Sequence, residues 1–281
     1  MYNLSNMRIA LLLVASIFIS STGYSQKTYS KETQDKIREV ENNISGGLLL
    51  NDEKPGTIIE RMAKYKVKGL SLAVIHNYKV VWAKGYGWAD EAEKRPMTAA
   101  TLFEPGSISK SLNAVGILKL AQDKKLDLYT DINTYLTSWK FPYDSLSKGK
   151  KITLANLLSH TGGLTVHGFP GHDIKGPIPT LLQVLDGKSP SFTPAVRSMY
   201  EPGVRHEYSG GGTSISQVIL TDIVKQPYDV WMYENVLKPI GMIHSTYAQP
   251  PAPALRKMLA SAYNRDGQPI DGKFHVYPEQ A

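Results

Sequence analysis

The stretch that decides the fold reads Glu104-Pro105-Gly106-Ser107-Ile108-Ser109-Lys110 and continues through helix-forming residues to Ala121. Ser107 and Lys110 are three residues apart, so on a helix both side chains leave from one face, one turn apart. A serine hydroxyl is a weak nucleophile until a base takes its proton, and a lysine whose charged form is disfavoured can be that base. The start of a helix also directs backbone N–H groups and a positive dipole end toward a developing oxyanion. The stretch therefore predicts a nucleophile and its base where a helix begins.

The same residues have a purely structural explanation, because a helix-capping serine followed by an exposed lysine is common. A second candidate is Tyr208, in Glu207-Tyr208-Ser209-Gly210-Gly211-Gly212. A phenol held near a lysine ammonium can transfer protons. We expect the glycines to form a tight backbone before a helix, and no Gly-Lys-Ser/Thr follows that would indicate a phosphate loop. Without the serine and lysine motif, we would interpret Tyr208 as a core tyrosine. With that motif present, a catalytic role is favoured.

The composition is that of an ordinary globular protein. The chain has 281 residues, 42% hydrophobic and 20% charged, enough for one large domain or two small ones. Its formal charge is +7, but the basic residues are scattered and form no run interleaved with aromatic side chains, so we predict no nucleic-acid binding. The chain has no cysteine, and its histidines show no metal-ligand spacing with acidic residues. We expect no disulfide, no metal and no cofactor.

The N-terminus is typical of an export signal. Arg8 precedes an apolar run over 9–19, and small residues ahead of Gln26 favour cleavage there. The run is too short to span a bilayer. We therefore expect a periplasmic or secreted protein without a stable membrane anchor after cleavage. The expected organisation is a signal peptide at 1–25, an N-terminal arm at 26–56 and one domain at 57–281.

The rest of the chain predicts a small sheet followed by a long helical stretch. The β-rich runs Leu70–His76 and Lys79–Gly87 flank Asn77-Tyr78, which indicates a hairpin. Two strands do not form a stable sheet alone, so further strands should follow. Besides the helix that holds Lys110, helices are expected at about 57–66, 153–159, 179–185, 213–224 and 228–237, and the charged stretch at about 29–44 is expected to be a helix or a partly ordered arm. The order predicts an α+β fold in which an antiparallel sheet flanked by helices and a helical region form a cleft.

Together these motifs resemble the serine β-lactamase-related family: class C β-lactamases, penicillin-binding D-Ala-D-Ala carboxypeptidases and esterases of the same fold. The resemblance covers most of the chain from about residue 57, in the family's order. The matching stretches are Gly69–Trp88, Phe103–Leu128, Ile152–Leu164, Pro202–Gly212 and Val236–Tyr247. The resemblance implies the β-lactamase/transpeptidase-like fold, with Ser107 acylated, Lys110 accepting its proton and Tyr208 activating water or relaying a proton.

The implied reaction is hydrolysis through an acyl-enzyme. The substrate would be an ester, a D-amino-acid peptide such as a peptidoglycan peptide, or a β-lactam, since one fold serves several acyl substrates. Either Lys110 or Tyr208 could be the immediate base. Three features of the sequence affect the implied reaction and substrates.

The first is Ser159-His160-Thr161-Gly162-Gly163. His160 could be a general base, or His160-Thr161-Gly162 could be the family's third motif, but the stretch lies between the other two motifs and follows a helix. We prefer a turn that ends that helix, with glycine supplying the positive φ. The Gly-x-Ser-x-Gly elbow of the α/β-hydrolases does not occur.

The other two are departures from the family pattern. Its second motif is usually Tyr-x-Asn, whereas this chain has Tyr208-Ser209-Gly210. A missing buried amide costs on the order of 1 to 3 kcal/mol of recognition, which disfavours β-lactams more than simpler esters or peptides. The third motif usually lies on a strand near the C-terminus, and no such strand is found before Ala281, so we expect the domain to be incomplete and its C-terminal strands missing. The alternative function is a non-catalytic remnant or binding protein.

Overall fold

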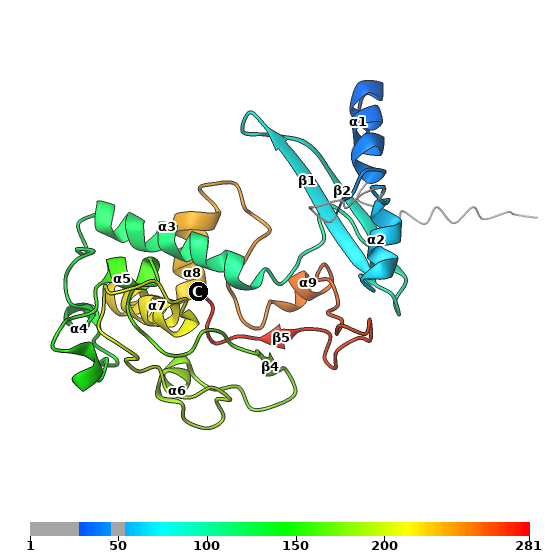
Figure 1. The fold of residues 1–281 in the computed structure, drawn as a ribbon. Coiled ribbons are helices and arrows are strands. Elements are labelled where there is room, and N and C mark those ends of the chain that lie inside the picture. The colour runs from blue at the N-terminus through cyan, green and yellow to red at the C-terminus, as the bar shows by residue number, and fades with distance from the viewer. Residues whose placement is uncertain (1–27, 46–53) are drawn as a thin grey trace, which may run out of the picture.

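A computed structural model describes residues 28–45 and 54–281 of the chain. The expected signal peptide and part of the expected N-terminal arm lie outside the described residues. The molecule has a hairpin region, with two helices beside it, and a larger helical region (Figure 1). Among the described residues, no helix has the length and apolar character that a membrane crossing needs.

The expected hairpin is present and forms most of a three-stranded antiparallel sheet. Its strands, in the order β1-β2-β3, are β1 (Gly69–His76), β2 (Lys79–Asp90) and β3 (Arg95–Pro96). Asn77 and Tyr78 both have positive φ, 48° and 60°, as the two central residues of a type I′ turn require. The hairpin prediction is confirmed, and β2 continues three residues beyond its expected end to pair with β3.

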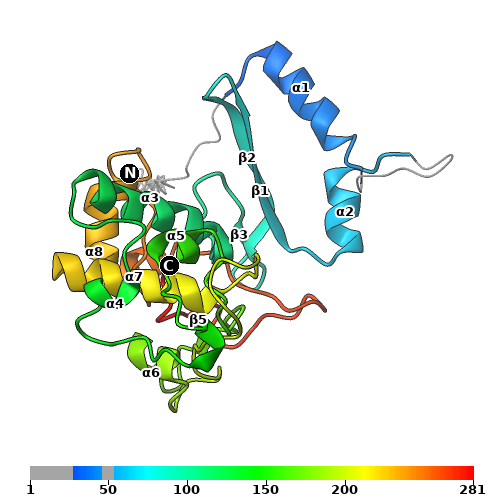
Figure 2. The same cartoon turned by 60° about the vertical axis from the view of Figure 1, so that its left-hand side comes forward.

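The helices α1 (Lys31–Glu41) and α2 (Ile58–Lys64) both lie on the side of the hairpin away from the helical region (Figure 2). Thr57 caps α2 through a reciprocal capping box with Glu60. The apolar face of α2 buries Ile58 and Met62 against Tyr86 of the hairpin. α2 was expected from the sequence and a helix was one of the two expectations for α1, with ends two or three residues shorter than predicted at most places.

The helical region surrounds one central helix, α7 (Gly210–Val224), of which almost every residue is buried. A short 3-10 turn, η1 (Gly106–Ile108), leads into α3 (Ser109–Gln122), whose buried residues recur at helical spacing. The remaining helices are α4 (Ile132–Tyr135), η2 (Ser145–Ser147), α5 (Leu154–Leu158), α6 (Leu181–Asp186), α8 (Tyr228–Met232), the π-helical turn η3 (Tyr233–Leu237) and α9 (Pro253–Arg256). α3, α4, α5, α6 and α8 all pack on α7.

Residues after α9 return across the molecule to the helical region. A second, two-stranded antiparallel sheet pairs β4 (His172–Asp173) with β5 (His275–Val276). Beyond β5 the chain runs beside α7, where the Gln217 side chain donates a hydrogen bond to the Pro278 carbonyl at 3.2 Å. The C-terminal end of the described chain therefore lies in the helical region, as Figure 1 shows.

Three details differ from the expectations. α7 begins at Gly210 rather than residue 213, because Ser209 caps it and accepts a hydrogen bond from the Gly212 N–H at 3.0 Å. The first three residues of the helix are therefore glycines. At Gly211 a larger residue would clash, because a Cβ there would lie 2.6 Å from Val196. The expected helix over 228–237 changes to π geometry after Met232.

In the turn after α5, the residue with the left-handed conformation is not the predicted one. It ends the helix as predicted, but the residue directly after the C-cap Ser159 is His160, with φ 55°. Gly163 has a positive φ three residues later, so our assignment of the helix-ending conformation to glycine was wrong. The cause is that α5 stops at Leu158, which places the histidine at the position that most often turns left-handed.

Candidate active site

Ser107 lies at an exposed bend directly before α3. Gly106 has φ 53°, a conformation that favours glycine, and it lets the chain turn into η1 with Ser107 at the middle of that turn. Lys110 is the second residue of α3 and is half-buried. The sequence therefore predicted the right position, although Ser107 stands on the 3-10 turn rather than in the α-helix itself.

The structure brings Ser107, Lys110 and Tyr208 together. The Tyr208 hydroxyl donates a hydrogen bond to Ser107 Oγ at 2.7 Å, although the two residues are 101 positions apart. The Lys110 Nζ donates to the same Oγ at 3.4 Å and lies 5.6 Å from the centre of the Tyr208 ring. One serine oxygen thus faces two groups that can exchange protons.

The Tyr208 ring is positioned by the turn before α7 and by two histidines. The His160 ring packs on it at 4.4 Å between centres, and His160 Nδ1 accepts a hydrogen bond from the Ser209 N–H at 3.2 Å. The His160 carbonyl accepts a second one from the Glu207 N–H at 2.8 Å. His167 Nδ1 lies against the Tyr208 carbonyl in a short hydrogen bond. The backbone on both sides of Tyr208 is therefore fixed.

His160 is best suited to this place in its neutral form. Burial, followed by the nearby His206 and Lys110, lowers the pKa of the imidazole below its usual range. A neutral ring can accept the Ser209 hydrogen bond at Nδ1, whereas a protonated ring could not. The sequence allows His160 to be a general base. In the structure its ring packs on Tyr208, and among the described residues it forms no hydrogen bond with Ser107.

A buried polar chain ties the helix of Lys110 to the helix that follows Tyr208. Asn113, fully buried on α3, donates to Ser216 of α7 at 2.9 Å and accepts from the Tyr228 hydroxyl at 2.9 Å. Tyr247 donates to the Ser109 carbonyl at 2.7 Å. Because buried polar groups are costly unless paired, these contacts favour one relative position of α3 and α7. The sequence analysis missed Asn113, although a polar residue on the apolar face one turn after Lys110 was a usable signal.

Ser107 and Lys110 open into a cavity of about 150 Å³. Phe169 forms one wall, and it explains the departure at Gly210. A Cβ at Gly210 would lie 3.1 Å from the Phe169 ring and 3.3 Å from the His167 carbonyl. An asparagine side chain at position 210 would therefore begin in tight contact with an aromatic ring, and Phe169 gives the cavity an apolar wall where the family pattern has an amide.

The same cavity is also lined by a buried acid. Glu279 is 7% exposed, and its Oε2 has no hydrogen-bond partner among the described residues. Burial raises the pKa of Glu279 to about 7. Sequence reasoning gave no signal for this residue, because nothing local distinguishes it from a surface glutamate. Within the described ranges, no group of three or more histidine and acidic side chains could hold a metal ion.

Comparisons with known proteins identify the family and the fold. The sequence profile of the Beta-lactamase family matches residues 56–278. Among curated proteins, the chain is 29% identical over 210 residues to "Protein flp" of Staphylococcus aureus, a match that covers 72% of this chain and 40% of the relative. It is 28% identical over 235 residues to a putative penicillin-binding protein, PbpX, of Bacillus subtilis, covering 82% of this chain and 52% of the relative. The chain thus spans about half or less of the length of these relatives.

Solved structures show the same fold. The octameric penicillin-binding protein homologue from Pyrococcus abyssi aligns with a TM-score of 0.61 at 25% identity, covering 76% of this chain and 48% of that one. A β-lactamase/D-alanine carboxypeptidase from Pseudomonas syringae aligns with a TM-score of 0.59 at 23% identity, covering 79% and 58%. The expected β-lactamase/transpeptidase-like fold is confirmed. Because the family profile matches well over half of the sequence, this chain belongs to the Beta-lactamase family of serine hydrolases.

Proposed function

We propose that the protein is a serine acyl-hydrolase that forms an acyl-enzyme on Ser107. The observation that carries the proposal is the contact of one serine oxygen with both the Tyr208 hydroxyl, at 2.7 Å, and the Lys110 amine, at 3.4 Å. A nucleophile within hydrogen-bond reach of a base is the signature of covalent catalysis. The family membership supports the same class of reaction.

In the proposed reaction, Ser107 Oγ forms a bond to the substrate carbonyl carbon while its proton passes to Lys110 or Tyr208. The amide groups where α3 begins stabilise the negative oxygen of the tetrahedral intermediate. The bond to the leaving alcohol or amine then breaks, and the leaving group takes the proton. Water attacks the acyl-enzyme, gives up a proton to the same base and releases the acid with Ser107 restored.

The substrate is proposed to be a small acyl compound or a peptide. The apolar wall at Phe169 disfavours substrates whose recognition depends on an amide at position 210. This supports an ester more than a β-lactam among the three classes that the family resemblance implies. We also propose, from the N-terminal sequence, that the protein acts in the periplasm or outside the cell.

Intact-mass analysis after exposure to a fluorophosphonate tests the proposal. We expect one adduct on the wild-type chain and none on Ser107→Ala, whereas Ser111→Ala, an exposed serine one turn further along α3, should label normally. Tyr208→Phe should slow labelling about 10²- to 10⁴-fold if the phenol transfers the proton. Tyr200→Phe is its control, because the Tyr200 hydroxyl is buried without a partner among the described residues.

A folded wild-type chain that gives no adduct would contradict the proposal and favour the alternative of a binding protein. Adducts of equal yield on the wild type and Ser107→Ala would contradict the assignment of the nucleophile. Far-ultraviolet circular dichroism of each variant separates loss of chemistry from loss of folding.

A further inference from the structure

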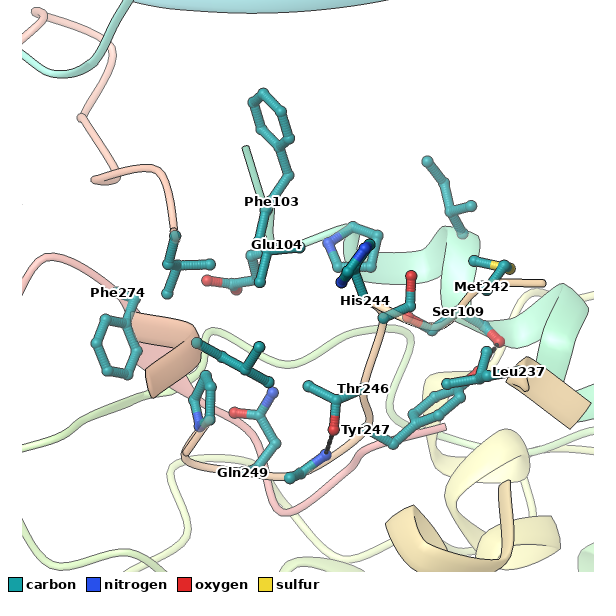
Figure 3. Close-up of a pocket in the computed structure, with 18 of the residues that line it drawn as sticks. Phe103, Glu104, Ser109, Leu237, Met242, His244, Thr246, Tyr247, Gln249 and Phe274 are labelled. Atoms are coloured by element: carbon teal, nitrogen blue, oxygen red, sulfur yellow. Dashed lines mark hydrogen bonds between the residues drawn. The ribbon is translucent and has the colours of Figure 1, made fainter. Parts of the chain in front are cut away.

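A second, larger cavity adjoins the cavity of Ser107. It has a volume of about 290 Å³ and is lined mainly by apolar side chains from α3, from η3 and its following loop, and from the α9 segment (Figure 3). Its size is close to the lower end of the range for small-molecule pockets. The mechanism proposed above uses none of these apolar residues.

The two cavities lie side by side along one segment of the chain. Glu104, Pro105, Ser109 and Gln249 line both of them. Ser107 belongs to this same segment and opens into the smaller cavity, and Ile108 lines the larger one. The apolar cavity therefore borders the cavity that Ser107 lines.

The apolar cavity has a buried floor and an exposed rim. Leu237, Tyr247 and Phe274 are buried and form its floor, whereas Phe103 and Met242 are 44% and 36% exposed. Figure 3 shows Phe274 at one end of the cavity and Met242 with Leu237 at the other. Large exposed apolar side chains gathered around a concave site indicate a surface that an apolar group covers.

Polar side chains are the minority of the cavity lining, and they include Glu104, His244 and Gln249. The Tyr247 hydroxyl is already committed to the Ser109 carbonyl at 2.7 Å, and Thr246 accepts from the Ala248 N–H at 3.0 Å. Phe169 adds an apolar side chain to the smaller cavity, which Ser107 also lines.

We propose that the cavity binds an apolar chain of the substrate, so that the preferred substrate is an ester with an aliphatic chain of several carbons. The inference rests on the proposed function only in assigning the scissile carbonyl to Ser107. The binding of the chain itself depends on the cavity alone. Burying each methylene should tighten binding about fourfold.

Binding to the Ser107→Ala chain tests this inference without any turnover. Ligand-observed NMR titrations with ethyl acetate and ethyl hexanoate should give a Kd at least tenfold lower for the hexanoate. Met242→Trp in the same background should remove that preference by filling the cavity. Ile243→Trp is the matched control, because Ile243 is 56% exposed, adjacent in sequence and absent from the cavity lining, so the preference should persist.

Equal affinity for the two esters, or a preference that Met242→Trp leaves intact, would overturn the inference. If that variant does not fold, Phe103→Arg at the exposed rim replaces it, and the same loss of preference is expected. Hydrolysis of p-nitrophenyl acetate by the chain with Ser107 intact is measured in parallel. Preference for the hexanoate with no hydrolysis would reject the proposed function while retaining the apolar site.

Discussion

The helical region buries more apolar side chains in one cluster than the hairpin region does. The helical region contains a continuous core around α7, in which Ile117, Ile215 and Ile219 are fully buried. Among the described residues, the cluster of the hairpin region is small and contains Ile58, Met62 and Tyr86, while Trp82 and Met97 are buried outside it. In the hairpin, Ile75 and Val80 are 66% and 62% exposed. A packed core holds its side chains in fixed positions, so the region that holds the proposed catalytic groups is also the one with the larger core.

The same contrast holds for the polar contacts. Ser107, Lys110 and Tyr208 all come from the helical region, where Asn113 links α3 to α7 and to Tyr228. The hairpin contributes none of these three side chains. We therefore expect substitutions in the two regions to differ both in their cost to stability and in their effect on Ser107.

The largest expected difference comes from truncating one apolar side chain in each region. Ile219→Ala, in the core around α7, should lower the free energy of unfolding by about 2 to 5 kcal/mol, because it removes buried contacts and leaves a cavity. Val80→Ala on the exposed strand should change it by about 0.5 kcal/mol or less. Chemical denaturation of both variants measures the difference. Equal losses would show that the hairpin is packed as tightly as the helical region.

A second prediction concerns Glu279, buried beside the nucleophile in the helical region. Because burial raises the pKa of Glu279 to about 7, the folded state holds the proton more tightly than the unfolded state. Its contribution to stability is full below about pH 4.5 and is lost as the pH rises through about 7, a change on the order of 3 kcal/mol. Glu279→Gln should lack this dependence, as denaturation at several pH values would show. The exposed Glu234→Gln should retain it, and a retained slope in Glu279→Gln would refute the assignment.

A third prediction gives the opposite pH dependence for Asp90, buried at the end of β2. Burial opposes the charged form, but hydrogen bonds from Lys273, Ser261 and the Glu93 N–H outweigh it and hold the pKa of Asp90 well below its usual range. Its stabilisation is present above about pH 4 and is lost as the pH falls below that.

Asp90→Asn should therefore cost about 1 to 3 kcal/mol at neutral pH and little in strong acid. Denaturation curves at neutral and acid pH measure this difference. The exposed Asp266→Asn serves as control and should behave like the wild type. A neutral-pH cost as small as that of the control would mean that Asp90 does not fasten the hairpin to residues 261–273.

Local sequence signals predicted the elements of both regions well. The hairpin at Asn77-Tyr78 follows from β-rich runs around a turn, and α2 follows from an amphipathic pattern. The starts of helices were less predictable. The glycines at 210–212 weaken a helix in isolation, but Val196 lies so close to Gly211 that a larger side chain there would clash, and Phe169 lies close to Gly210. Tertiary contact therefore overrode local preference.

The sequence by itself determined the order of the motifs, the serine and lysine where a helix begins, and the tyrosine before a glycine-rich helix start, because each depends on neighbours within a few residues. Only the tertiary structure decided that Tyr208 reaches Ser107 across 101 positions, that Asn113 joins two helices, and that Phe169 lies close to Gly210. It also decided that Glu279 is buried beside the nucleophile. Such contacts depend on which distant segments of the chain meet in the fold. A local pattern of residues does not specify which segments these are.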